Sequence, residues 1–599
     1  MNTELLEIYQ NLVSQYQTQS DLKKKQLKLI SIARFFSFLS IIPAYYYLQP
    51  VNEILALAVS ILLLASFLFL IKKFIQSEKL LNYNLRLVEI NKNEIKAIQR
   101  DYSSFDPGNE FIDPHHDYSY DLDLFGPNSF FQFLNRTSTH SGKKQLAKLL
   151  NKSKRTEEEI LENQSAIQEL VRELNWRQQF LASGKETEEP GISNRIEASI
   201  GRTTELKSAK TLKIILNILP FVTVILIGLS IWGITERSYY LPAVFVQWAL
   251  FVIYSKTISK FNKQFESQAK SLDRYAGLLR LIETKSFESK KLNRLKHGLS
   301  VQEKTASTIT YELHKILNEF DYRQNIIVGF VLNSLFLWDI RCLIKLNDWQ
   351  RNYSGELAKW LEIIAEMDAL ISLANLNYNH PDWVTPKPAR SGFHLSARDL
   401  GHPLIDENRC VRNSFDLSGD EQIVIITGAN MAGKSTFLRT VGVNLVLASM
   451  GCNVCSTNFE FQPVRVFTNM RTSDNLMNDE SYFYAELLRL QSMLNLIRKG
   501  EQLFVIIDEM LKGTNSTDKL NGSKELIHQL ISLKSHGIVA THDLALTELA
   551  EKLTEIKNQC FEVLLHNEEL TFDYKLSDGV TRTMNATFLM KKMGIIPQK

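Results

Sequence analysis

A chain of 599 residues exceeds what one hydrophobic core can organise, so several domains are expected. Its net charge of +3 gives no global reason to expect nucleic acid, although it permits a local basic groove. Five cysteines include a lone C-x-x-C at Cys452 and Cys455, which indicates a small core-facing pair in a reducing compartment rather than a zinc site. Residues 1–30 are polar and helical in pattern, so we predict an N-terminal cytoplasmic helix and no cleavable signal peptide.

Residues 31–73 predict a first transmembrane hairpin. The run 35–52 is uncharged and rich in Phe, Ile and Tyr, and the run 54–71 is uncharged and almost wholly aliphatic. Each is near the lower limit of about 17–25 residues for crossing a bilayer. Basic residues flank the pair, with Lys23, Lys24, Lys25, Lys28 and Arg34 before it and Lys72, Lys73 and Lys79 after it. The turn carries no Lys or Arg, so the positive-inside rule places both ends in the cytoplasm.

Residues 211–256 repeat this plan as a second hairpin. Uncharged runs at 214–235 and 238–255 are separated by Glu236 and Arg237. Basic residues flank this pair as well: Lys207, Lys210 and Lys213 before it, and Lys256, Lys260 and Lys263 after it. The alternative is four buried helices of a soluble core, but such helices usually keep a polar stripe, which these segments almost lack. We therefore predict four membrane spans.

A shorter apolar patch at 326–340 contains Asn333 and Asp339, and we predict a buried helix of a soluble domain there. Residues 74–210 and 257–388 are helical in pattern, with 74–105 reading as one continuous polar helix, and they predict two parts of a helical core and lever. A Pro-rich stretch at 381–388 marks the boundary to a last domain at 389–599, whose strand and helix patterns alternate as in an α/β sheet.

The strongest motif lies at 423–440, IVIITGANMAGKSTFLRT, where a buried strand turns into a helix through G-x-x-x-x-G-K-[ST]. Gly428 and Gly433 would let backbone N–H groups approach phosphate oxygens closely. Lys434 would reach the β- and γ-phosphates of ATP, and the Ser435 hydroxyl would ligate Mg²⁺. This order of strand, loop and helix predicts a P-loop.

Two further strands end in polar pairs. Residues 502–507 predict a buried strand that leads into Asp508 and Glu509. Asp508 would hold the water shell of Mg²⁺, and Glu509 would act as general base on the attacking water. Residues 537–540 predict another short strand, and the Thr541-His542 pair that follows it is suited to sensing the γ-phosphate.

These blocks together resemble the ATPase domain of MutS-type mismatch-repair proteins. The resemblance rests on ITGANMAGKST, DNLMNDESYFYAELLRL, LFVIIDEMLKGTNSTDKLNG and IVATHDLALTEL, with HPLI at 402–405 upstream and ELTFDYKLSDGV at 569–580 downstream. More weakly, 133–150 and 360–374 resemble the beginning and end of the family's helical core and lever. The expected fold is an ABC-type, MutS-like P-loop NTPase domain behind a helical core and lever that two transmembrane hairpins interrupt.

The resemblance implies a homodimer with two composite ATP sites. Ser481, Phe483 and Glu486 would reach the partner's γ-phosphate, while Ser516 and Asp518 would lie in the turn that couples the sites. The predicted nucleotide-binding residues are Gly428, Asn430, Gly433, Lys434, Ser435, Thr436, Ser481 and Thr541. The predicted catalytic residues are Glu509, Lys434 and His542, and the predicted Mg²⁺ residues are Ser435 and Asp508.

The sequence departs from the family in ways that bear on function. It shows no mismatch-reading N-terminal domain, and Cys410 and Val411 follow HPLI where the family usually carries an aromatic residue that stacks on adenine. We expect a membrane-anchored ATPase that moves a helical lever, with DNA bound weakly and without mismatch preference. The alternative is a DNA mismatch-repair protein whose apolar segments form a soluble core. A transporter ATPase is a third option, against which HPLI and GTNSTD argue.

Overall fold

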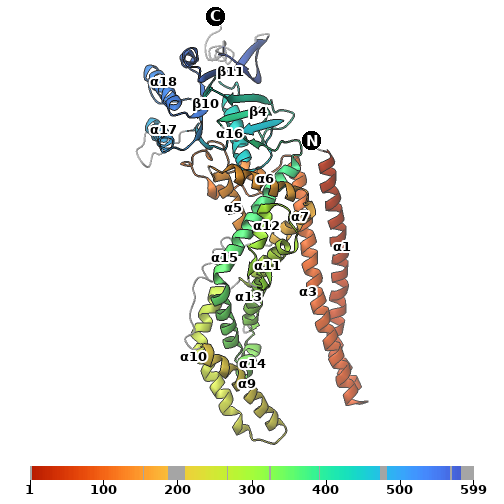
Figure 1. Ribbon diagram of the computed structural model, residues 1–599. Coiled ribbons are helices and arrows are strands. Elements are labelled where there is room, and N and C mark those ends of the chain that lie inside the picture. Colours follow the sequence, from red (N-terminus) through yellow and green to blue (C-terminus); the bar gives the residue numbers. More distant parts are fainter. Residues whose placement is uncertain are drawn as a thin grey trace.

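The structure is a computed structural model that describes the following residues: 3–152, 154–185, 209–265, 268–301, 303–322, 325–389, 392–471, 482–566 and 569–581. A helical body occupies the middle of the molecule, and an α/β domain lies at one end of it (Figure 1). Two helical hairpins extend from the body in the opposite direction (Figure 1).

The first hairpin consists of α1 (Thr3–Leu39), α2 (Ile41–Leu48) and α3 (Glu53–Ile98), and α1 packs along α3. Asn52 caps α3 by accepting a hydrogen bond from Leu55 N at 3.1 Å. Helix α3 has 46 residues and continues without a break from the apolar run into the polar stretch that we predicted as a separate helix from residue 74. The membrane-type segment and part of the helical body therefore share one helix.

The second hairpin consists of α9 (Ala209–Ile231) and α10 (Leu241–Phe265), joined through η2 (Arg237–Tyr239). Helix α14 (Ile326–Phe336) packs against both α9 and α10. The prediction of one buried helix over 326–340 is wrong, because α14 ends at Phe336 and keeps large apolar side chains exposed. The sequence of an apolar helix does not show how many other helices pack against it, and here α9 and α10 cover only one side of α14.

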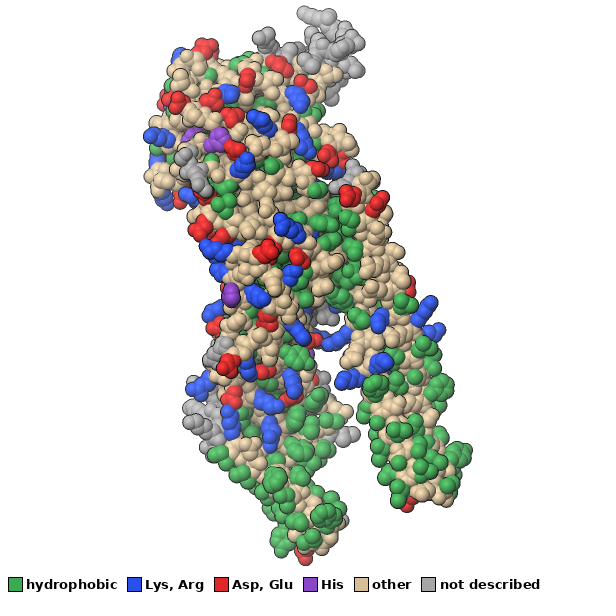
Figure 2. All heavy atoms as spheres, turned by 45° about the vertical axis from the view of Figure 1, so that its right-hand side comes forward, with side chains coloured by type: hydrophobic (Ala, Val, Ile, Leu, Met, Phe, Trp, Pro, Cys, Tyr) green, Lys and Arg blue, Asp and Glu red, His purple; other side chains and the backbone are tan. Residues whose placement is uncertain are grey.

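The four apolar segments are not folded into a core. Their most apolar 18-residue windows are 6%, 6%, 17% and 11% buried, which contradicts the alternative of a soluble core. By length and composition, these four helices could each cross a membrane. Figure 2 shows hydrophobic side chains covering the far ends of both hairpins, with Lys and Arg side chains gathered between these ends and the body.

The helical body is formed mainly by the C-terminal half of α3 and by eight further helices. These are α4 (Phe130–Leu134), α5 (His140–Asn151), α6 (Glu157–Val171), α7 (Leu174–Gly184), α11 (Ala269–Thr284), α12 (Lys290–His297), α13 (Ala306–Asp321) and α15 (Trp338–Asn379). The short turn η1 (Asn109–Phe111) and the two-residue strands β1 (Ser300–Val301) and β2 (Lys304–Thr305) complete it. Helix α15 has 42 residues and ends before the Pro-rich boundary predicted at 381–388.

The segments predicted as the beginning and end of the helical core and lever, 133–150 and 360–374, contact each other. The fully buried carboxylate of Asp368 on α15 accepts hydrogen bonds from Thr139 N at 2.8 Å, Thr139 Oγ1 at 2.7 Å and Ser138 N at 3.0 Å. Burial raises the pKa of Asp368 to about 6, although these donors oppose the shift.

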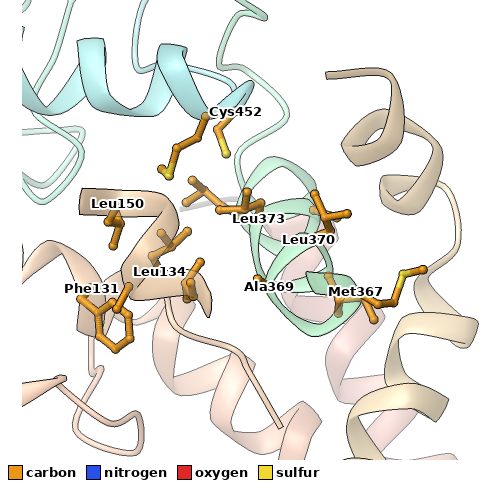
Figure 3. Close-up of a cluster of buried hydrophobic side chains, with 14 of the residues drawn as sticks. Phe131, Leu134, Leu150, Met367, Ala369, Leu370, Leu373 and Cys452 are labelled. Carbon is orange, nitrogen blue, oxygen red and sulfur yellow. The ribbon is translucent and has the colours of Figure 1, made fainter. Parts of the chain in front are cut away.

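One hydrophobic cluster joins this contact to the α/β domain. Figure 3 shows Leu134 of α4 between Phe131 and the α15 helix, which carries Leu370 and Leu373, and all four side chains belong to this cluster. Cys452, just after α16 of the α/β domain, closes the cluster, and both Cys452 and Cys455 are buried as the sequence predicted. Helix α15 and the α/β domain therefore share one hydrophobic cluster.

The α/β domain has a six-stranded sheet in the order β12-β11-β6-β10-β9-β8, in which only β12 is antiparallel. Its strands are β6 (Ile423–Gly428), β8 (Arg465–Asn469), β9 (Leu503–Asp508), β10 (His536–Thr541), β11 (Ile556–His566) and β12 (Glu569–Asp578). The helical elements of the domain are α16 (Lys434–Met450), α17 (Tyr482–Arg498), α18 (Ser516–Ser532) and η5 (Leu544–Glu551). A second sheet, in the order β3-β7-β4-β5, contains β3 (Lys387–Pro388), β4 (His394–Leu400), β5 (Asn413–Ser418) and β7 (Asn458–Phe461).

Candidate active site

The candidate site begins where β6 ends at Gly428 and α16 begins at Lys434. Every residue of β6 is buried, as expected for the central part of a parallel sheet. Gly433 caps α16 with a φ of 104°, and a Cβ there would lie 3.1 Å from Cδ1 of Tyr574. Both the conformation and the space require glycine at this turn. The first N–H groups of α16 therefore point into the loop.

The Lys434 side chain folds back over this loop. Its Nζ donates to the carbonyl oxygens of Gly428 at 2.6 Å and of Ala429 at 2.9 Å. Burial lowers the pKa of Lys434 to about 8, although the nearby carboxylates of Asp508 and Glu509 oppose the shift. A poorly solvated ammonium at the N-terminus of a helix is well placed to bind an anion.

Ser435 and Asp508 meet across the carboxyl edge of the sheet. The Ser435 hydroxyl donates to Oδ2 of Asp508, the last residue of β9, at 2.5 Å. A hydroxyl and a carboxylate give an all-oxygen pair, which suits the hard cation Mg²⁺. The two residues predicted for the metal are thus adjacent, and their chemistry fits this ion.

Glu509 follows β9 in a left-handed conformation, with a φ of 64°, and its N–H donates to the carbonyl oxygen of Ala540 at 2.9 Å. Its carboxylate accepts from Lys519 Nζ at 2.6 Å. Burial acts to raise the pKa of Glu509, but the Lys519 ammonium outweighs it and the net pKa is lowered. Glu509 is therefore an ionised carboxylate, and Lys519 of α18 holds it.

Thr541 and His542 lie at the end of β10, beside Gly428. Thr541 is buried, and its Oγ1 accepts from Asp543 N at 3.0 Å. Burial lowers the pKa of His542, and the positive charge of Lys434 lowers it further. The imidazole is thus kept neutral at physiological pH and faces the same cavity as Lys434.

A cavity of about 660 Å³ opens in front of the P-loop. Asn430 and Thr436 line it, as predicted, together with Cys410 and Val411 from the segment after HPLI. Tyr574 of β12 also lines the cavity, and it brings to this site an aromatic side chain that the segment after HPLI lacks.

Tyr574 is held at the cavity by its backbone. Its φ is 55°, and its carbonyl oxygen accepts from Asn413 Nδ2 at 3.0 Å, while Asn413 Oδ1 accepts from Leu576 N at 2.9 Å. The signal for this residue was present in FDYKLSDG, within the last block that carried the resemblance. It was missed because β12 lies far from HPLI in the sequence.

The segment expected to reach a partner subunit is only partly described. Ser481 lies outside the described residues. Glu486 is buried and accepts from Leu511 N at 2.7 Å and Lys512 N at 3.1 Å, so its predicted role across a dimer is wrong. It fixes the turn after Glu509 instead, because two backbone donors there need an acceptor.

The remaining predicted residues lie on this side of the domain. Phe483 is half-buried on α17 and packs close to Gly513. Ser516 is the first residue of α18 and Asp518 lies in its first turn, where Asn515 caps the helix by accepting from Asp518 N at 2.9 Å. The GTNSTD block is therefore the start of the helix that also carries Lys519.

Comparison with known proteins bears on the α/β domain. Residues 424–599 match the family model for MutS domain V. The chain is 30% identical over 276 residues to the DNA mismatch repair protein MutS of Staphylococcus haemolyticus (strain JCSC1435). It is 30% identical over 277 residues to the protein of the same name from Staphylococcus saprophyticus subsp. saprophyticus. Each match covers 44% of this chain and 30% of the relative, so the chain spans less than a third of the length of these relatives.

Proposed function

The chain belongs to the MutS family through its C-terminal domain, and from this premise we propose that it is a membrane-anchored ATPase. It binds ATP with Mg²⁺ and hydrolyses it at composite sites of a homodimer. Nucleotide binding and release move the α15 lever, because the ATPase domain and this helix share one hydrophobic core. Its ATPase domain is cytoplasmic, and four helices hold it to a bilayer.

The observation that supports this proposal most directly is the convergence of Lys434, Ser435 and Asp508 at the mouth of one cavity. Lys434 would exchange its two loop carbonyl partners for the β- and γ-phosphate oxygens. Ser435 and, through water, Asp508 would hold Mg²⁺, which supplies charge neutralisation for the phosphates when bound. Tyr574 would lie against the adenine ring at the other end of the cavity.

Hydrolysis requires a water in line with the γ-phosphate and a group that accepts its proton. Glu509 is ionised and follows the strand that ends in Asp508, which suits the role of general base. Its ion pair with Lys519 would have to loosen before a water can take that place. Neutral His542 would donate to the γ-phosphate from the next strand.

The membrane location is supported by the exposed apolar surface of both hairpins, which lie at the same end of the molecule (Figures 1 and 2). In water this surface would be an aggregation hazard, whereas acyl chains would cover it without cost. Detergent-free extraction checks this: a protein that leaves the membrane fraction fully in buffer alone, as a soluble dimer, would contradict the anchor.

DNA is proposed as a weak ligand without mismatch preference. The printed name of the relatives concerns DNA mismatch repair, and the chain shares less than a third of their length. Binding to matched and mismatched duplexes at several salt concentrations tests this, with equal affinity and a steep salt dependence expected. Much tighter binding of a mismatched duplex would favour a repair function.

The decisive experiment on the enzyme compares two variants of the full chain in detergent micelles. Lys434→Ala should lose ATP binding, whereas Glu509→Gln should bind ATP normally and hydrolyse it roughly 10²–10⁴-fold more slowly. Hydrolysis by Glu509→Gln at the parent rate would refute the general base. In mixed dimers, Ser481→Ala should impair the site of the other subunit if the sites are composite.

A further inference from the structure

Helix α14 is a short apolar element that the four membrane spans do not account for. Its 11 residues, IIVGFVLNSLF, carry no charge. At 1.5 Å per residue, it is roughly 16 Å long, about half of a hydrocarbon core of about 30 Å. It can therefore enter a bilayer but cannot cross it.

The chain enters and leaves α14 at the same place on the helical body. Trp338, just after α14, donates from Nε1 to the carbonyl oxygen of Glu319 near the end of α13, at 2.9 Å. The rings of Tyr322 and Trp338, which flank the segment, lie 6.3 Å apart. Lys345 also reaches back to Glu319 with an ion pair of 2.8 Å. The segment that contains α14 therefore leaves the helical body and returns to it at the same place.

One face of α14 is packed against the second hairpin and its polar groups have partners. Trp248 of α10 donates from Nε1 to Ser334 Oγ at 3.0 Å, and its ring lies 5.5 Å from that of Phe330. The Asn333 amide donates to Gly329 O at 2.9 Å and accepts from Asp339 N at 3.0 Å. No polar group of this face therefore needs water among the described side chains.

The other face is apolar and exposed. Val328 is 41% exposed, Val331 44% and Phe336 40%. This face continues the surface of α9 and α10, which α14 contacts and which exposes large side chains such as Phe221 and Phe245. An occupant that covers the hairpin would therefore also cover α14.

The residues around the two ends of α14 are those found at a membrane surface. Tyr322 and Trp338 combine an apolar ring with a polar tip, which favours the interface between acyl chains and headgroups. Arg341 donates to the carbonyl oxygens of Phe336 and of Leu216 on α9, and so ties the segment to the hairpin. If these groups lie at a membrane surface, α14 and the part of α9 near Leu216 lie at the same depth in the bilayer.

We propose that α14 is a re-entrant helix that inserts into the bilayer leaflet nearest the helical body, with its exposed face against lipid acyl chains. The inference rests on the proposed membrane anchor, and it adds a third contact between the lever region and the bilayer. Helix α13 precedes this segment and α15 follows it, so the ends of both helices would lie at the membrane surface. The lever would then contact the bilayer directly, in addition to its connection through the two hairpins.

Site-specific fluorescence quenching in the full-length protein tests the proposal. An environment-sensitive dye is attached at Val331→Cys, after reconstitution into phosphatidylcholine and phosphatidylglycerol vesicles, and the unsubstituted protein gives the background labelling. Ile225→Cys on α9 is the matched lipid control, and Tyr311→Cys on α13 is the matched aqueous control, since both side chains are exposed to a similar degree. Val328→Cys, one turn earlier on the same face, is an independent second site.

Dyes at 331 and 328 should be quenched by nitroxide-labelled lipid to within twofold of the dye at 225, and iodide should quench them at least fivefold less than the dye at 311. Iodide quenching at 331 and 328, with lipid quenching kept at 225, would overturn the re-entrant helix alone. Quenching by neither agent would mean that protein covers this face, which also overturns it. Iodide quenching at 225 as well would refute the membrane anchor itself.

Discussion

Arg100 and Ile405 are 305 positions apart and are joined by a hydrogen bond of 2.9 Å from Nη2 to the carbonyl oxygen. The same guanidinium donates to Leu404 O at 3.1 Å and pairs with Asp406 Oδ2 through Nε at 3.0 Å. Arg100 follows the end of α3 directly, whereas residues 404–406 line the cavity in front of the P-loop. The helix that begins in the first hairpin thus holds one wall of the candidate ATP site.

Arg100→Ala should weaken ATP binding. Removing hydrogen bonds from a charged donor typically costs about 1.5–3 kcal/mol of free energy. We expect about half of this loss to appear as weaker ATP binding, which corresponds to roughly a tenfold loss of affinity. Titration with a fluorescent ATP analogue measures the effect. Lys96→Ala is the matched control, because it removes a cation from the last turn of α3 whose described hydrogen bond is a long one of 3.5 Å to Ser104. Equal affinity of both variants would contradict the role of Arg100.

Nucleotide binding should take up a proton at alkaline pH. The pKa of Lys434 is about 8 without nucleotide, and bound phosphates favour the ammonium, so its pKa rises on binding. Affinity is then fully present below about pH 8 and falls as pH rises between 8 and 9.5. Calorimetry at pH 8.5 in buffers of different ionisation enthalpy should reveal the proton. An affinity that is constant from pH 7 to 9.5 would refute this reading of Lys434.

Tyr574→Ala should weaken ATP binding by roughly tenfold, because stacking of a base on an aromatic ring is worth about 1–3 kcal/mol. Tyr574→Phe keeps the ring and should bind as the parent does. Binding of inorganic triphosphate, which has no base, should be the same for all three proteins. If Tyr574→Ala weakened triphosphate equally, the residue would support the loop at Gly433 and not the base.

Stability should fall as pH rises from about 4 to about 6. The Asp368 carboxyl has a pKa of about 6 in the folded protein and about 3.9 when unfolded, so the folded state holds the extra proton in this window. Above pH 6 the contribution of this group is level. Thermal melting at fixed detergent concentration measures the slope.

Asp368→Asn is the control for this slope. It should be less stable at every pH, by about 1–3 kcal/mol, because an amide NH₂ cannot accept the bonds from Ser138 and Thr139. Its melting temperature should also lose the decline between pH 4 and 6. A variant that keeps the parent's full pH dependence would show that other groups cause it.

The strands and the cavity residues of the α/β domain could largely be predicted from local sequence patterns. The strands predicted at 502–507 and 537–540 correspond to β9 and β10 within one residue at each end. Fully buried parallel strands are short apolar runs that stop at a polar turn, so sequence alone shows both their bodies and their ends. For the same reason Lys434, Ser435, Asp508 and His542 were found together, and the structure places them around one cavity.

Contacts between distant segments were not readable. Nothing near Arg100 in the sequence indicates a contact with residues 404–406. Nothing near Cys410 indicates that the aromatic side chain of Tyr574 lines the same cavity. Glu486 was assigned to a partner because it lies near Ser481 along the chain, whereas its carboxylate turns inward to a neighbouring loop. The exposure of α14 depends on how many helices pack against it, and the hydropathy of a segment does not predict how many neighbours it has.

The unbroken course of α3 has a mechanical consequence. Its 46 residues extend over roughly 69 Å at 1.5 Å per residue. A pivot of about 5° at the apolar end of this helix would displace the opposite end by about 6 Å, twice the length of a hydrogen bond. Bilayers of different thickness impose such pivots on helices. If α3 is anchored as proposed, the hydrogen bond from Arg100 to Ile405 is kept only when the whole helical body turns with α3. Bilayer thickness would then alter the candidate ATP site.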